Sequence, residues 1–102
     1  MLHAKRAVVV DPRDNVATAL DELEIGDAVA LAAGEARLTV ELIDHIPFGH
    51  KFGLFFIKTG SSVLKYGEVI GVATRDIAPG EHVHIHNVAS TRGRGDLAGQ
   101  GQ

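Results

Sequence analysis

The chain has 102 residues, of which 45% are hydrophobic and 23% are charged, and its formal net charge is −3 with histidine neutral. This length fits one small domain. Its scattered Lys and Arg residues do not favour nucleic acid or an anionic membrane as a partner. Because there is no cysteine, the chain alone cannot form a disulfide, a thiolate nucleophile or an iron–sulfur cluster. This fits a cytoplasmic protein.

The N-terminal region has no apolar segment of the length that a signal peptide needs. Asp11 and Pro12 interrupt the first apolar run at residues 7–10. No other apolar run approaches the ~20 residues of a membrane-spanning helix. We therefore expect neither a signal peptide nor a transmembrane segment.

Short apolar runs alternate with turn residues along the chain. They lie at residues 7–10, 28–33, 38–43, 52–57, 62–64 and 69–73. Many short runs separated by Gly, Pro and Asp predict a mostly β domain with at most one or two short helices. Residues 16–23 are ambiguous, and we expect a strand that runs into a short helical turn.

One sequence pattern occurs three times. An aliphatic residue, two others, a Gly, two others and a Val follow one another at residues 23–29, 57–63 and 77–83. The Gly supplies a positive φ, which other residues adopt only at a cost. We interpret the pattern as one turn used three times, with its aliphatic residues packed on the core.

The segment of residues 80–87 contains three of the six histidines. If it is a strand, His82, His84 and His86 share one face, and Val83, Ile85 and Asn87 the other. Neutral imidazole is a good ligand for zinc, iron or manganese. The alternative is a partly exposed face whose histidines bond to neighbours or water.

Two further clusters carry reactive side chains. His50 and Lys51 follow Gly49 and suit a carboxylate or phosphate, although they also fit a polar turn. Lys65 and Tyr66 precede Gly67 and could act as acid or base in a dry cleft. They also fit a solvated lysine and a packed tyrosine. We expect one domain over residues 1–90 and a flexible, Gly-rich tail over residues 91–102.

In their order along the chain, these clusters resemble the N-terminal domain of the altronate and galactarate dehydratase family. The resemblance covers most of residues 14–96 and rests on Gly-His-Lys at 49–51, Lys-Tyr-Gly at 65–67 and His-Val-His-Ile-His-Asn at 82–87. It implies a SAF-type domain, an antifreeze-like module with a β-clip fold. The small subunit of sulfolactate sulfo-lyase, which eliminates sulfite instead of water, is a similar relative.

The resemblance implies the small subunit of a sugar-acid dehydratase, a hydro-lyase that gives a 2-keto-3-deoxy acid. The expected partners are a large catalytic subunit and a sugar acid, and the resemblance leaves room for a homo-oligomer. It also implies a divalent metal, iron or manganese, in the assembled enzyme. We expect the chain to be inactive alone. The alternatives are a sulfolactate sulfo-lyase small subunit and a non-catalytic binding or lid module.

The expected roles follow from the resemblance and from residue type. Substrate binding is assigned to His50, Lys51 and Asn87. Proton transfer is assigned to Lys65, Tyr66, His84 and His86. The metal is assigned to His82, His84 and His86.

Overall fold

Nine short strands make up the computed structural model, which describes residues 5–90. They are β1 (Ala7–Val8), β2 (Val16–Ala19), β3 (Ala28–Ala33), β4 (Ala36–Glu41), β5 (Lys51–Gly53), β6 (Ser62–Lys65), β7 (Glu68–Ala73), β8 (His82–Val83) and β9 (Val88–Ser90). No helix forms within this range, so none there could cross a membrane. The mostly β prediction is confirmed. The predicted tail lies outside the described residues.

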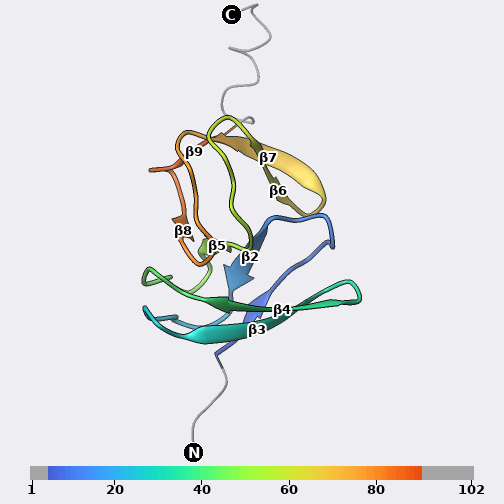
Figure 1. The fold of residues 1–102 in the computed structure, drawn as a ribbon, viewed down its shortest axis with the longest axis vertical. Coiled ribbons are helices and arrows are strands. Elements are labelled where there is room, and N and C mark those ends of the chain that lie inside the picture. Colours follow the sequence, from blue (N-terminus) through green and yellow to red (C-terminus); the bar gives the residue numbers. More distant parts are fainter. Residues whose placement is uncertain (1–4, 91–102) are drawn as a thin grey trace, which may run out of the picture.

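The strands form three small antiparallel sheets. β1, β2, β5 and β8 make a four-stranded sheet, β3 and β4 a hairpin, and β6, β7 and β9 a three-stranded sheet. Figure 1 shows the β3–β4 hairpin across one end of the molecule and the β6–β7–β9 sheet near the other. The four-stranded sheet lies between them, so β5 and β8 occupy the middle of the fold.

Two apolar clusters fill the space between the sheets. The first gathers around Phe52 and Leu23, and the second around Val63 and Ile77. On β3 buried and exposed residues alternate strictly, because successive strand side chains point to opposite faces. The four-stranded sheet contributes residues to both clusters, so both clusters depend on the same strands.

The repeated Gly pattern is confirmed as a repeated turn, and within residues 5–90 it occurs four times. Gly26, Gly49, Gly60 and Gly80 have φ between 83° and 91°. In each turn the residue after the Gly donates to the carbonyl three positions earlier, at 2.9–3.1 Å. This matches a type II turn, which needs positive φ at its third residue. The fourth copy, residues 46–52, does not fit the sequence pattern because Phe52 stands where the other copies have Val.

Two predicted elements differ from the structure. After β2 the chain bends instead of forming a helical turn, because Leu23 exchanges main-chain hydrogen bonds with Ile46 at 2.9–3.0 Å. In the run at residues 52–57 only β5 is a strand, and Phe55 and Phe56 are exposed.

Candidate functional site

The histidine-rich segment is a strand only at β8 and then turns sharply. The predicted strand over residues 80–87 is therefore wrong beyond Val83. The cause is Asn87, which is fully buried. Its Oδ1 accepts a hydrogen bond from the His84 amide at 3.0 Å, and its Nδ2 donates to the His82 carbonyl at 2.8 Å. These bonds favour a turn over a continued strand.

Asn87 thus has a supporting position. We predicted that it binds substrate, but its side chain is enclosed and bonded to main-chain groups. The turn that it holds exposes Ile85 to 84%. Ile85 therefore does not share a face with the buried Val83 and Asn87, as a continued strand would require.

Three imidazoles form a stacked cluster. His50 lies 4.5 Å from His84 and 5.1 Å from His82 between ring centroids, and the planes are nearly parallel. His50 Nδ1 and His82 Nε2 are 2.9 Å apart and share a hydrogen bond. Because one nitrogen must donate and the other accept, the pair is most stable with at least one imidazole neutral. The fold brings these rings together by pairing β5 with β8.

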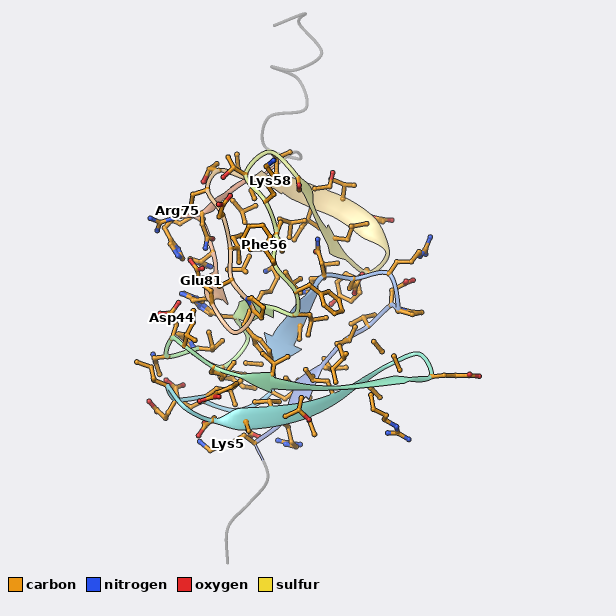
Figure 2. The ribbon with its side chains drawn as sticks, in the orientation of Figure 1. Lys5, Asp44, Phe56, Lys58, Arg75 and Glu81 are labelled. Carbon is orange, nitrogen blue, oxygen red and sulfur yellow. The ribbon has the colours of Figure 1, made fainter. Side chains whose placement is uncertain are left out.

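The electrostatics at His82 and His84 favour the neutral imidazole. Burial lowers the pKa of His82, and the neighbouring His50, His86 and His84 lower it further, while Asp44 opposes them. Burial and then His50 lower the pKa of His84. Asp44 also accepts the His82 amide at 2.9 Å. Asp44 and Glu81 lie on the side of the molecule that carries β8 (Figure 2).

The residues present fit a transition metal, although not with the predicted set. One ligand nitrogen from each of His50, His82 and His84 lies within 4.8 Å of the others. Three imidazoles are a suitable donor set for zinc, iron or manganese. His86 is outside this group, and its ring is tilted and 5.4 Å from that of His82. A metal that binds His50 Nδ1 or His82 Nε2 would replace the hydrogen bond between these two atoms.

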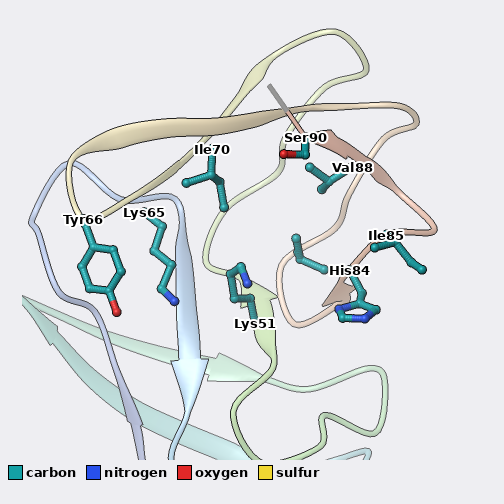
Figure 3. Close-up of a pocket in the computed structure, with 9 residues that line it drawn as sticks. Lys51, Lys65, Tyr66, Ile70, His84, Ile85, Val88 and Ser90 are labelled. Atoms are coloured by element: carbon teal, nitrogen blue, oxygen red, sulfur yellow. The ribbon is translucent and has the colours of Figure 1, made fainter. Parts of the chain in front are cut away.

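A pocket of about 430 Å³ lies beside the histidine cluster. Its lining residues are Lys51, Lys65, Tyr66, Ile70, Val83, His84, Ile85, Val88 and Ser90. Figure 3 shows Lys65 and Tyr66 on one side, His84 and Ile85 on the other, and Lys51 between them. The structure thus brings together four predicted site residues from the three sequence motifs. The apolar lining was not predicted.

The pocket carries positive charge without acidic lining residues. Burial, and then the Lys65 ammonium, lower the pKa of Lys51. None of the nine lining residues is Asp or Glu. Two ammonium groups and an imidazole in a partly apolar hollow favour an anionic ligand. The lowered pKa makes Lys51 easier to convert to a neutral base than an ordinary lysine.

Tyr66 occupies an unusual backbone position. Tyr66 and Gly67 form the two-residue turn between β6 and β7, with φ of 58° and 71°. Among residues 5–90 Tyr66 is the one non-Gly residue with positive φ. The Lys65 ammonium lies 4.7 Å from the centroid of the Tyr66 ring, within the range of a cation–π contact.

The fold and pocket define a small all-β module with a cationic, histidine-rich site. A comparison with protein families matches residues 5–91 to the altronate/galactarate dehydratase SAF domain. The chain belongs to this family, which confirms the resemblance found in the sequence.

Three relatives illustrate the match. Altronate dehydratase of Bacillus subtilis (strain 168) is 40% identical over 83 residues, which are 81% of this chain and 16% of the relative. That of Escherichia coli (strain K12) is 47% identical over 74 residues, 72% of this chain and 14% of the relative. The (2R)-sulfolactate sulfo-lyase subunit alpha of Paracoccus pantotrophus is 47% identical over 56 residues, 55% of this chain and 81% of the relative. The chain thus spans less than a fifth of the altronate dehydratases.

Proposed function

We propose that this chain contributes one wall of the active site of a sugar-acid dehydratase whose other wall belongs to a larger catalytic chain. The supporting observation is the pocket lined by Lys51, Lys65, Tyr66 and His84, with no acidic lining residue. A carboxylate substrate fits this charge. Two of the relatives that match the chain are named altronate dehydratases.

The reaction removes the proton α to a carboxylate and expels the β-hydroxyl, and the enol product becomes a 2-keto-3-deoxy acid. It needs a base, an acid for the leaving hydroxyl and a positive centre for the enediolate. In the proposal Lys51 binds the substrate carboxylate, a role that the sequence also predicts for His50. Lys65, Tyr66, His84 and His86 are the candidates for proton transfer, of which the first three line the pocket, and His84 takes this role only when it does not hold the metal.

His50, His82 and His84 would hold the divalent metal, iron or manganese, that the family resemblance implies. A bound divalent ion would supply positive charge for the enediolate. His86, the third residue predicted as a ligand, would then be free for proton transfer. The neutral state of His82 and His84 suits both metal binding and base chemistry. We also propose that the protein is cytoplasmic, as expected from the sequence.

A second candidate is a small subunit of a sulfolactate sulfo-lyase. The aligned segment covers 81% of one such subunit alpha and 62% of another, so that subunit is similar in extent to this chain. Sulfolactate is also an anion, and the same pocket charge suits it. This candidate keeps the elimination chemistry and exchanges water for sulfite as the leaving group.

The test is to purify the chain with the large chain that assembles with it and to assay D-altronate, galactarate and (2R)-sulfolactate. A keto-deoxy acid product supports the dehydratase, and sulfite release supports the sulfo-lyase. No turnover with any of these acids would contradict both. We expect the chain alone to be inactive.

Two variants separate catalysis from a binding or lid role. If the module is catalytic, His84→Ala and Lys65→Ala should lower kcat while the complex still assembles. If the module only binds or covers the substrate, both variants should raise KM and leave kcat unchanged. Val10→Ala, at an exposed position outside the pocket lining, is the matched control and should change neither.

A further inference from the structure

Asp14 is one of two polar residues among the buried side chains of the described chain, and the site proposed above does not use it. It is 2% exposed and lies before β2, far in sequence from the pocket motifs. A carboxylate is costly to bury unless it is hydrogen-bonded. What Asp14 bonds to therefore indicates what it does.

Both oxygens of Asp14 accept hydrogen bonds from the turn that carries Tyr66. Oδ2 accepts from the Tyr66 amide at 3.0 Å, and Oδ1 accepts from the Gly67 amide at 2.8 Å. Oδ2 also accepts from the Asp11 amide at 3.1 Å. The carboxylate is thus bonded to two successive amides of the β6–β7 turn, across more than 50 residues of sequence.

Asn15, the next residue along the chain, forms hydrogen bonds with β6, the strand that leads into this turn. Asn15 Oδ1 accepts from the Leu64 amide at 2.8 Å, and Asn15 Nδ2 donates to the Ser62 carbonyl at 3.0 Å. Asn15 therefore fixes β6, and Asp14 fixes the turn that follows it. A β-carbon on Gly67 would come within 2.7 Å of Asp11 Oδ2, so this segment packs closely against the turn.

The turn needs this support because Tyr66 has φ of 58°. The left-handed region is unfavourable for a bulky side chain, and surrounding structure must hold it there. In that conformation the Tyr66 ring lines the pocket and lies against the Lys65 ammonium. Asp14 itself does not line the pocket.

We propose that Asp14 is a positioning residue, which holds the strained Tyr66–Gly67 turn so that Tyr66 and Lys65 face the anionic ligand. The part of this inference that concerns the anionic ligand rests on the proposed function, but the positioning of Tyr66 and Lys65 can be measured without a ligand. Asp14→Asn leaves the shape of the side chain and replaces one accepting oxygen by a donor group that faces amide donors.

The first measurement is the NMR spectrum of the full chain. In the wild type the Tyr66 ring current should shift the Lys65 side-chain resonances, and Tyr66→Ala gives the reference without it. Asp14→Asn should remove that shift while the resonances of Phe52 and Ile77 stay in place. Asp76→Asn is the matched control, because Asp76 accepts the Thr59 amide at 2.9 Å in another turn. It should leave the Lys65 shift unchanged.

The second measurement needs no variant and covers the case in which Asp14→Asn does not fold. The Tyr66 and Gly67 amides should exchange slowly with solvent in the wild type, although they belong to a surface turn. Exchange at the rate of an open peptide would overturn the proposal. So would a Lys65 shift that survives Asp14→Asn.

The functional arm uses galactarate as the probe. In the complex of this chain with its large partner, Asp14→Asn should weaken galactarate binding by about tenfold, because the turn no longer holds Tyr66 and Lys65 toward the ligand. In a Tyr66→Ala background the same change should have little further effect, because no ring remains to be positioned. An equal loss in both backgrounds would contradict a positioning role. A wild-type complex of this chain with its large partner that does not bind galactarate would count against the proposed function, and the spectrum would still decide the role of Asp14.

Discussion

At the scale of single residues, the histidine cluster links pH to folding. His82 has a pKa below its ordinary value because of burial and of its histidine neighbours. Between that lowered pKa and the unfolded value near 6.5, the unfolded chain binds more protons than the folded one. Folding stability must then rise with pH across this window and fall as the pH drops through it.

We predict that the midpoint of urea unfolding decreases as the pH is lowered from about 7.5 to about 5.5. His82→Gln should reduce this dependence, since it removes one of the two imidazoles with a lowered pKa. His45→Gln is the control, because His45 lies outside the cluster and pairs with Glu22. A pH dependence that is the same in wild type and His82→Gln would show that His82 does not carry the effect.

The second residue-scale prediction concerns Tyr66. Asn tolerates positive φ, and Asn-Gly is a favoured two-residue hairpin turn. Relief of the backbone strain in Tyr66→Asn should therefore raise the free energy of unfolding by roughly 0.5–1 kcal/mol. Loss of the contact between the Tyr66 ring and the Lys65 ammonium offsets part of this gain. Tyr66→Phe keeps the strain and the ring, so its stability should match the wild type.

Urea denaturation measures both variants, and galactarate titration follows binding. We expect Tyr66→Asn to be more stable and to bind more weakly. This opposite change would indicate that the Tyr side chain serves the ligand at the expense of the fold. A loss of stability in Tyr66→Asn would refute the claim that the turn is strained by its side chain.

At the scale of elements, four similar turns differ in how closely they are packed. A β-carbon on Gly80 would lie 2.2 Å from the Glu41 carbonyl oxygen, whereas one on Gly60 would meet nothing within 4 Å. Their φ angles, 83° and 88°, are nearly the same. The two positions therefore separate the cost of backbone conformation from the cost of a clash.

We predict that Gly60→Ala lowers the free energy of unfolding by about 1 kcal/mol, the cost of a left-handed residue. Gly80→Ala should lower it by more than about 3 kcal/mol, because backbone must move as well. Denaturant titration of both variants gives the difference. Equal losses would mean that the Gly80 turn can shift away from β4 without cost.

The sequence predicts these elements unevenly, for physical reasons. The Gly turns are local, and positive φ leaves a residue-type signal, so three copies were predicted and confirmed. The histidine turn depends on Asn87 side-chain bonds that alternation of His and apolar residues does not encode. Likewise, no local signal links Asp14 to Tyr66, because the contact exists only after β2 and β6 come together.

At the scale of the whole molecule, the two apolar clusters share one sheet. β2 contributes Val16 to the second cluster and Ala17 and Ala19 to the first. β5 places Phe52 in the first cluster, and its neighbour β8 places Val83 in the second. Neither cluster can lose its packing without disturbing strands on which the other depends. We therefore expect residues 5–90 to unfold in one cooperative transition.

Phe52 provides the test of this shared core. It is fully buried, and it directly follows Lys51 in the pocket-forming strand. Phe52→Ala should cost about 3–5 kcal/mol, a large share of the roughly 5–15 kcal/mol that stabilises a domain of this kind. Phe56→Ala, at a residue that is 60% exposed, should change stability by less than about 0.5 kcal/mol.

The cooperative unit is checked by following two NMR probes during urea unfolding, Leu23 in the first cluster and Ile77 in the second. In Phe52→Ala both probes should move to lower urea together, although the cavity is in the first cluster. A separate, earlier transition for Leu23 would mean that the clusters unfold independently. In that case Lys51 would be held by one part of the fold and Lys65 by another, and the pocket between them would open before the chain unfolds.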